Sequence, residues 1–149
     1  MDTSIAVIIP TLNEENFISA CLDSIIQQTY PFEKMDIMVI DGGSSDRTQE
    51  IVETYHYKYN NIRLLQNPRK IQSIAFNIGV QESSAPYIIR LDAHAIYDSS
   101  YIEKCISGII HQKNIGNIGG VLMIKPVNNS LWAVTNAILN QSKFGIGGA

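Results

Sequence analysis

Short apolar runs rich in isoleucine and valine recur between residues 5 and 91, and they constrain the fold more than any other feature of the chain. The runs are IAVII (5–9), DIMVI (36–40), IRLL (62–65) and YIIRL (87–91). Their short length and apolar character are typical of strands that are buried on both faces of a parallel sheet.

Helical patterns separate these runs. Three stripes keep the i, i+3, i+4, i+7 spacing of an amphipathic helix: Ile18, Cys21, Leu22 and Ile25; Ile71, Ile74, Ala75 and Ile78; and Ile102, Cys105, Ile106 and Ile109. Asn13, Ser44 or Ser45, and Asp98 are expected to be the N-caps of their helices. Strand and helix alternating at intervals of about 25 to 30 residues predict βαβ units, and so an α/β fold with an open, mostly parallel sheet flanked by helices.

The last part of the chain is less regular. NIGGVLMIKP (117–126) indicates a further strand or pair of strands, and a final helical stripe passes through Leu131, Val134, Thr135 and Ile138. The chain then ends on the glycine-rich SKFGIGGA. We therefore expect residues 1–149 to be a single domain that forms the N-terminal part of a longer protein.

Composition excludes several classes. No stretch approaches the roughly 20 apolar residues that span a bilayer, and MDTSIAVIIP lacks the basic region of a signal peptide. Cys21 and Cys105 are expected to be buried free thiols, as in a reducing compartment, so a cytoplasmic location is predicted. No basic run with interleaved aromatic residues indicates nucleic-acid binding.

The loop PTLNEEN follows the first predicted strand, where open α/β sheets bind ligands. A dinucleotide-binding fold would place G-x-G-x-x-G here to bind a pyrophosphate. This chain instead has Pro10, Asn13, Glu14 and Glu15. Acidic side chains repel phosphate but accept hydrogen bonds from a base or ribose, which disfavours a Rossmann dehydrogenase. The alternative for both glutamates is a favourable interaction with a helix dipole.

The second predicted strand ends in VIDGGSSD. Gly42 and Gly43 permit a tight turn, and the residues after them are expected to cap the next helix. Asp41 is the residue that this turn leaves unexplained. Its carboxylate is in a position to accept a hydrogen bond from a ribose hydroxyl or a base N–H.

The fourth predicted strand leads into RLDAHAIYD. Side chains two positions apart on an extended backbone point to the same side, so Asp92 and His94 can converge on one ion. Carboxylate oxygen suits Mg²⁺ and Mn²⁺, and imidazole favours Mn²⁺ or another transition ion. Such an ion could bridge the oxygens of a diphosphate. The alternative is a strand-end aspartate beside a solvent-facing histidine.

Taken together, four segments resemble the family 2 glycosyltransferases, which are inverting, nucleotide-sugar-dependent enzymes with the GT-A fold. The segments are VIIPTLNEENFISACLDSI, VIDGGSSDRT, NPRKIQSIAFNIGV and IIRLDAHA. The similarity covers nearly the whole chain from Ile5 onward. It is greatest to a subgroup of transferases that build succinoglycan-like polysaccharides.

The resemblance implies roles in nucleotide binding. Pro10, Asn13 and Glu14 match the first nucleotide-binding loop of the family. Asp41 matches the first aspartate of its DDGS turn, which contacts the base. Lys70 resembles a basic residue near the nucleotide, and its neighbour Arg69 has a similar claim to that role.

The resemblance also places Asp92 and His94 on the DXD motif, with histidine in place of the last aspartate. Asp92 is therefore expected to contact the nucleotide diphosphate, and Asp92 and His94 are expected to hold Mn²⁺ or Mg²⁺. Neutral imidazole is a competent ligand for such ions.

The implied reaction transfers a sugar from a nucleotide-diphosphate sugar, with a UDP-sugar favoured, to a carbohydrate or lipid-linked acceptor hydroxyl. The general base of the family is an Asp or Glu beyond the DXD motif. After Ala95 the chain has only two carboxylates, Asp98 and Glu103, and neither is expected to be the base. We expect the base to lie beyond residue 149, with any contact to the inner face of the membrane also made by regions outside this chain. Two alternatives are a non-catalytic nucleotide-sugar-binding module and a nucleotidyltransferase.

Overall fold

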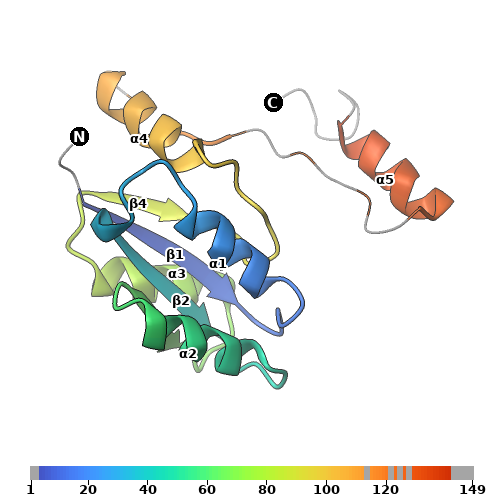
Figure 1. Ribbon diagram of the computed structural model, residues 1–149, viewed down its shortest axis with the longest axis horizontal. Coiled ribbons are helices and arrows are strands. Elements are labelled where there is room, and N and C mark those ends of the chain that lie inside the picture. The colour runs from blue at the N-terminus through green and yellow to red at the C-terminus, as the bar shows by residue number, and fades with distance from the viewer. Residues whose placement is uncertain (1–3, 113–114, 121–122, 124–125, 127–128, 142–149) are drawn as a thin grey trace. The chain divides into compact units, whose positions relative to one another are not determined.

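The computed structural model describes residues 4–112, 115–120, 123, 126 and 129–141. They belong to two compact units, residues 1–116 and 117–149. In the first unit, β1 (Ile5–Thr11), β2 (Met35–Asp41), β3 (Ile62–Gln66) and β4 (Tyr87–Arg90) form a parallel sheet in the order β3-β2-β1-β4 (Figure 1). All four runs predicted as strands are therefore strands.

Helices follow each of the four strands. They are α1 (Ile18–Ile26), the short 3₁₀ helix η1 (Phe32–Lys34), α2 (Thr48–Lys58), α3 (Gln72–Glu82) and α4 (Tyr101–His111). The predicted open parallel sheet flanked by helices is confirmed. The second unit contains α5 (Leu131–Gln141), which covers the predicted final stripe.

Alternate residues of the central strand β1 face two different hydrophobic clusters. Ile5, Val7 and Ile9 pack with buried residues of α1, α2 and α4. Ala6 and Ile8 pack with residues of β2 and α3. Because β1 is buried along its whole length, both faces need apolar side chains, and this explains the unbroken run IAVII.

The strand register brings the ligand-binding loops together. Thr11 pairs with Asp41, and Asp41 pairs with Gln66, so β1, β2 and β3 end side by side. β4 is shorter, and its last residue, Arg90, pairs with Ile8. The loops after all four strands therefore start at one edge of the sheet, as parallel topology requires.

The predicted N-caps are wrong. Helix α1 begins at Ile18, α2 at Thr48 and α4 at Tyr101, each several residues after the predicted cap, and none has a side-chain cap hydrogen bond. The reason is that these polar side chains bond within or between the loops instead. The Asp98 carboxylate, for example, accepts a hydrogen bond from the Ser100 N–H at 3.1 Å, before α4 begins.

Two smaller expectations also need correction. In the predicted strand 117–126, the described residues 117–120, 123 and 126 are not in a strand, and the others lie outside the described residues. Gly119 and Gly120 weaken strand formation there. Cys21 is buried as expected, but Cys105 is only half-buried; both are free thiols. Among the described residues, no helix is long and apolar enough to cross a membrane.

Candidate functional site

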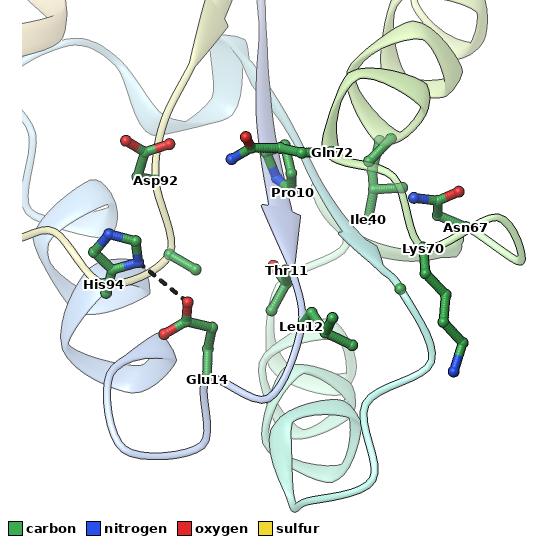
Figure 2. A pocket seen from close by; sticks show the side chains of 13 residues that line it. Pro10, Thr11, Leu12, Glu14, Ile40, Asn67, Lys70, Gln72, Asp92 and His94 are labelled. Atoms are coloured by element: carbon green, nitrogen blue, oxygen red, sulfur yellow. Dashed lines mark hydrogen bonds and ion pairs between the residues drawn. The ribbon is translucent and has the colours of Figure 1, made fainter.

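A pocket lies at the edge of the sheet where the strands end (Figure 2). Segments from all four strand ends contribute to it: Pro10, Thr11, Leu12 and Glu14; Ile40 and Gly42; Asn67, Lys70, Gln72 and Ala75; and Asp92, Ala93 and His94. Five residues predicted from the sequence are among them, namely Pro10, Glu14, Lys70, Asp92 and His94. Asn13 and Asp41 do not line the pocket.

Asp41 is fully buried, and its carboxylate closes the turn after β2. It accepts hydrogen bonds from the main-chain N–H groups of Gly43 and Ser44, both at 2.8 Å, from Gln49 Nε2 at 2.7 Å and from the Ser44 hydroxyl. Gly43 has a φ of 80°, which glycine adopts without strain. Sequence reasoning left Asp41 outside the turn, whereas the structure places it at the turn's centre.

Asn13 ties the first two loops together. Its φ of 55° is in the left-handed region, which asparagine tolerates better than most residues. Its N–H donates to Ser44 Oγ at 2.8 Å, and its side-chain oxygen accepts from the Ser45 N–H at 2.8 Å. Asn13 therefore shapes the loop that carries Glu14.

Glu14 is held at the other side of the same loop. Its N–H donates to Thr48 Oγ1 at 2.8 Å, at the start of α2. Its carboxylate oxygen Oε1 lies 3.1 Å from Nδ1 of His94 (Figure 2). This contact joins the loop after β1 to the loop after β4.

Asp92 and His94 lie in a turn rather than on an extended strand. β4 ends at Arg90, and the Ala95 N–H donates to the Asp92 carbonyl at 3.2 Å. The extended backbone assumed for this pair is therefore wrong, although both residues do line one pocket. Arg90 Nη2 donates to Asp92 Oδ1 at 2.9 Å. Asp92 Oδ2 has no hydrogen-bond partner in the described part of the chain.

A half-buried tyrosine and a buried cysteine fix the main chain of Asp92. The Asp92 N–H donates to the Tyr97 hydroxyl, which itself donates to the Asp92 carbonyl, and the Cys21 thiol donates to the same carbonyl at 3.6 Å. Burial, with the nearby charges of Asp92 and Glu14, raises the pKa of the Cys21 thiol to about 12. Burial also raises the pKa of Tyr97. Both groups are therefore neutral hydrogen-bonding groups at physiological pH.

The donor set of the pocket fits a cation that takes further ligands from its substrate. Among the described residues, no group of three or more His, Cys, Asp or Glu side chains could hold a metal ion. Asp92 offers a carboxylate oxygen and His94 a ring nitrogen, while the Glu14 carboxylate in the same pocket is bonded to His94. Mg²⁺ and similar ions are often held by one or two carboxylates together with water and substrate phosphates. The pair is compatible with that arrangement.

Lys70 is the only cationic side chain among the described lining residues. Its φ of 57° is left-handed, and its side chain lies beside Gly43, where an added Cβ would come within 3.5 Å of Lys70 Cε. Its ammonium group makes no hydrogen bond or ion pair with any described residue. Lys70 is therefore available to an anion that enters the pocket.

Asn67 was missed by sequence reasoning. It is 2% exposed, lines the pocket, and its Oδ1 is the one buried side-chain polar atom without a partner among the described residues. Its Nδ2 donates to the Ile71 carbonyl at 2.9 Å, which leaves the oxygen as the unbonded end of the amide. A buried acceptor of this kind is costly unless a ligand satisfies it. The only sequence signal was its position directly after the third strand.

Comparison with known proteins places this geometry in context. The model of the family described as glycosyl transferase family 2 matches residues 6–147. The chain is 32% identical over 149 residues to the succinoglycan biosynthesis protein ExoA of Rhizobium meliloti, covering 99% of this chain and 44% of that protein. It is 32% identical over 124 residues to a dolichyl N-acetyl-alpha-D-glucosaminyl phosphate 3-beta-D-2,3-diacetamido-2,3-dideoxy-beta-D-glucuronosyltransferase of Methanococcus voltae, covering 79% and 39%. The chain thus spans less than half the length of both relatives.

Solved structures share the fold. TarS of S. aureus in complex with UDP matches with a TM-score of 0.64 at 22% identity, over 81% of this chain and 39% of that chain. The mannosyltransferase PcManGT from Pyrobaculum calidifontis in complex with GDP-Man and Mn²⁺ matches with a TM-score of 0.71 at 23% identity, over 78% of this chain and 34% of that chain. The predicted glycosyltransferase fold of the GT-A type is confirmed.

Proposed function

The chain belongs to glycosyl transferase family 2, and from that premise we propose that its pocket binds the nucleoside diphosphate of a nucleotide-sugar donor. The observation that carries this proposal is that Lys70, Asp92 and His94 all line one pocket at the carboxyl edge of the sheet. A basic side chain and a pair of metal-ligand types are what an anionic diphosphate with a divalent cation requires.

Different parts of the donor are assigned to different residues. Pro10 and the loop that carries Glu14 are assigned to the nucleoside side, and Asn67 offers an unpaired acceptor to an N–H or O–H of the nucleoside. Asn13 and Asp41 support that side from behind, because their side chains hold the two loops in place. Lys70 attracts the diphosphate. Asp92 and His94 hold Mn²⁺ or Mg²⁺. Neighbouring structures bind UDP or GDP-Man, and we favour a UDP-sugar.

The proposed reaction is a single displacement. The oxygen of an acceptor hydroxyl forms a bond to the anomeric carbon while the bond from that carbon to the diphosphate oxygen breaks, so the configuration inverts. A divalent cation, when bound, would neutralise the negative charge that develops on the departing diphosphate. The acceptor is a carbohydrate or lipid-linked hydroxyl, in cell-surface or extracellular polysaccharide synthesis at the cytoplasmic side of the membrane.

The proton of that hydroxyl must go to a base within hydrogen-bond reach. Asp98 and Glu103 do not line the pocket. Hydrogen bonds from Ser100 lower the pKa of Asp98, and the Glu103 carboxylate accepts a hydrogen bond from the Thr29 hydroxyl. We propose that the base comes from sequence beyond this chain.

A thermal-shift panel tests the proposal. UDP, GDP, ATP and NAD are each added with and without Mn²⁺. A rise in melting temperature with UDP or GDP that requires Mn²⁺ is expected, because a ligand that binds only the folded state stabilises it. Stabilisation by NAD alone, or by no nucleotide, would contradict the proposal.

A further inference from the structure

We propose that Glu14 is a positioning residue that sets the tautomer of His94, so that Nε2 is the ring nitrogen offered to a divalent cation. This inference rests on the function proposed for the pocket. It also differs from the role that the family resemblance implies for Glu14, which is a direct contact to the nucleotide.

The backbone of Glu14 is fixed on both sides. Its N–H donates to the hydroxyl of Thr48, which is fully buried and itself donates to Asp46. Its carbonyl accepts the N–H groups of Phe17 and Ile18, both at 2.9 Å, where the chain enters α1. The side chain is only 19% exposed. Glu14 is therefore a rigid support for a partner on another loop.

That partner is His94, 80 residues later in the chain, whose Nδ1 lies 3.1 Å from Glu14 Oε1. A carboxylate has only acceptor atoms, so the hydrogen of this bond must be on Nδ1. A neutral imidazole with its hydrogen on Nδ1 has its lone pair on Nε2. In Figure 2, this second ring nitrogen lies on the Asp92 side of the ring, away from Glu14. It bonds to no described residue.

The contact is better explained by orientation than by stability. The His94 side chain is 63% exposed, and an ion pair with so exposed a partner adds little to folding. A carboxylate that accepts the second N–H of a metal-binding imidazole, by contrast, orients the ring and makes it more basic. Loss of such a partner commonly weakens metal binding by about 10- to 100-fold.

Nitrogen NMR reads the tautomer directly. A chain labelled with ¹⁵N-histidine is examined without metal at about pH 8, where a free imidazole is neutral. We expect the wild-type His94 signal to show hydrogen on Nδ1 and a bare Nε2. In E14Q, whose amide can donate as well as accept, we expect a mixture of tautomers. Hydrogen on Nε2 in the wild-type chain would overturn the inference, whatever the variants do.

Metal affinity is measured in parallel by electron paramagnetic resonance of Mn²⁺ in the presence of UDP. E14Q should weaken Mn²⁺ binding by about tenfold. The matched control is E15Q, because the Glu15 carboxylate accepts a hydrogen bond from the Arg47 N–H and does not line the pocket. E15Q should bind Mn²⁺ as the wild-type chain does.

The outcomes separate this inference from the proposed function. If the wild-type chain binds Mn²⁺ and UDP together, the proposed function stands. If E14Q then binds Mn²⁺ as tightly as the wild-type chain, the inference about Glu14 is overturned. E14Q could instead bind UDP more weakly without metal while its Mn²⁺ affinity and its His94 tautomer stay unchanged. That result would also overturn the inference and would support a direct contact between Glu14 and the nucleotide. A wild-type chain that binds neither Mn²⁺ nor UDP contradicts the proposed function itself.

Discussion

The Tyr97 hydroxyl bridges the two main-chain polar groups of Asp92. It accepts a hydrogen bond from the Asp92 N–H at 2.7 Å and donates one to the Asp92 carbonyl at 3.2 Å. The Tyr97 N–H in turn donates to Ser24 Oγ on α1, at 3.1 Å. The turn that carries the predicted metal ligands is thereby fastened to the buried Ser24 of α1, and its geometry is set before any ligand binds.

Tyr97→Phe tests that role. The substitution keeps the ring but removes both hydrogen bonds, so we expect Mn²⁺-dependent UDP affinity to fall by about tenfold. Stability should fall by about 1 to 2 kcal/mol. Isothermal titration calorimetry and urea unfolding measure the two effects.

Tyr55→Phe is the matched control for Tyr97. The Tyr55 hydroxyl donates to Asp23 at 2.7 Å and also contacts the Ser19 carbonyl, and Tyr55 does not line the pocket. Its loss should lower stability without changing UDP affinity. Equal UDP affinity in both variants would show that Tyr97 supports the fold and not the site.

Asn67→Leu is expected to lower UDP affinity with little effect on the stability of the fold. The wild-type Oδ1 is buried without a partner, so its removal relieves a desolvation cost that offsets the lost bond to the Ile71 carbonyl. We expect the free energy of unfolding to change by less than about 1 kcal/mol, and UDP affinity to fall by about tenfold. Calorimetry with UDP and urea unfolding check both. If Asn67→Leu binds UDP as tightly as the wild-type chain, Asn67 does not contribute to UDP binding.

Gly79→Ala should destabilise the chain. A Cβ at this position of α3 would lie 2.7 Å from Cδ1 and Cγ1 of Ile8, which is fully buried on β1. Such overpacking typically costs about 1 to 3 kcal/mol and outweighs the better helix propensity of alanine. Urea unfolding measures the loss. Gly116→Ala, where an added Cβ meets nothing within 4 Å, is the control and should unfold like the wild-type chain.

The raised pKa of the Cys21 thiol predicts that the folded chain loses stability at alkaline pH. Its thiol pKa is raised from the ordinary value of 9.0 to about 12 by burial. Between these values the unfolded chain loses the proton and the folded chain keeps it, so stability is complete below pH 9 and falls above it. At one pH unit above 9.0 the loss is about 1.4 kcal/mol. Urea unfolding at pH 8 and pH 10 measures the free energy of unfolding. We expect it to fall less between these pH values in Cys21→Ser than in the wild-type chain. An equal fall in both proteins would contradict the raised pKa of Cys21.

The sequence predicted the scaffold well because its signals are local. The runs around Ile8, Met38 and Ile89 have the β-branched and apolar character of buried strands, and the helical stripes repeat every turn. The same local reasoning failed for the caps. Asn13 and Ser45 have the chemistry of N-caps, but the Asn13 side chain bonds to the Ser45 main chain instead of capping its own helix. Contacts between residues far apart in the sequence determine this hydrogen bond, so a local sequence pattern cannot predict it.

The residues that line the candidate site were predicted in part for the same reason. Pro10 lies near the end of β1, and Lys70 and Asp92 lie in the loops after β3 and β4. A parallel sheet brings the ends of its strands to one edge. What the sequence could not show is how the side chains pair once they are there. The contact between Glu14 and His94 joins two loops 80 residues apart, and the unpaired Asn67 oxygen is recognised only when its neighbours are known.

A crystal structure of the chain with Mn²⁺ and UDP, with the metal located by its anomalous signal, tests the central claim most directly. We expect one manganese peak within about 2.5 Å of both the Asp92 carboxylate and Nε2 of His94, shared with oxygens of the diphosphate. A nucleotide bound with no manganese at Asp92, or a manganese ion held elsewhere on the chain, would contradict the account.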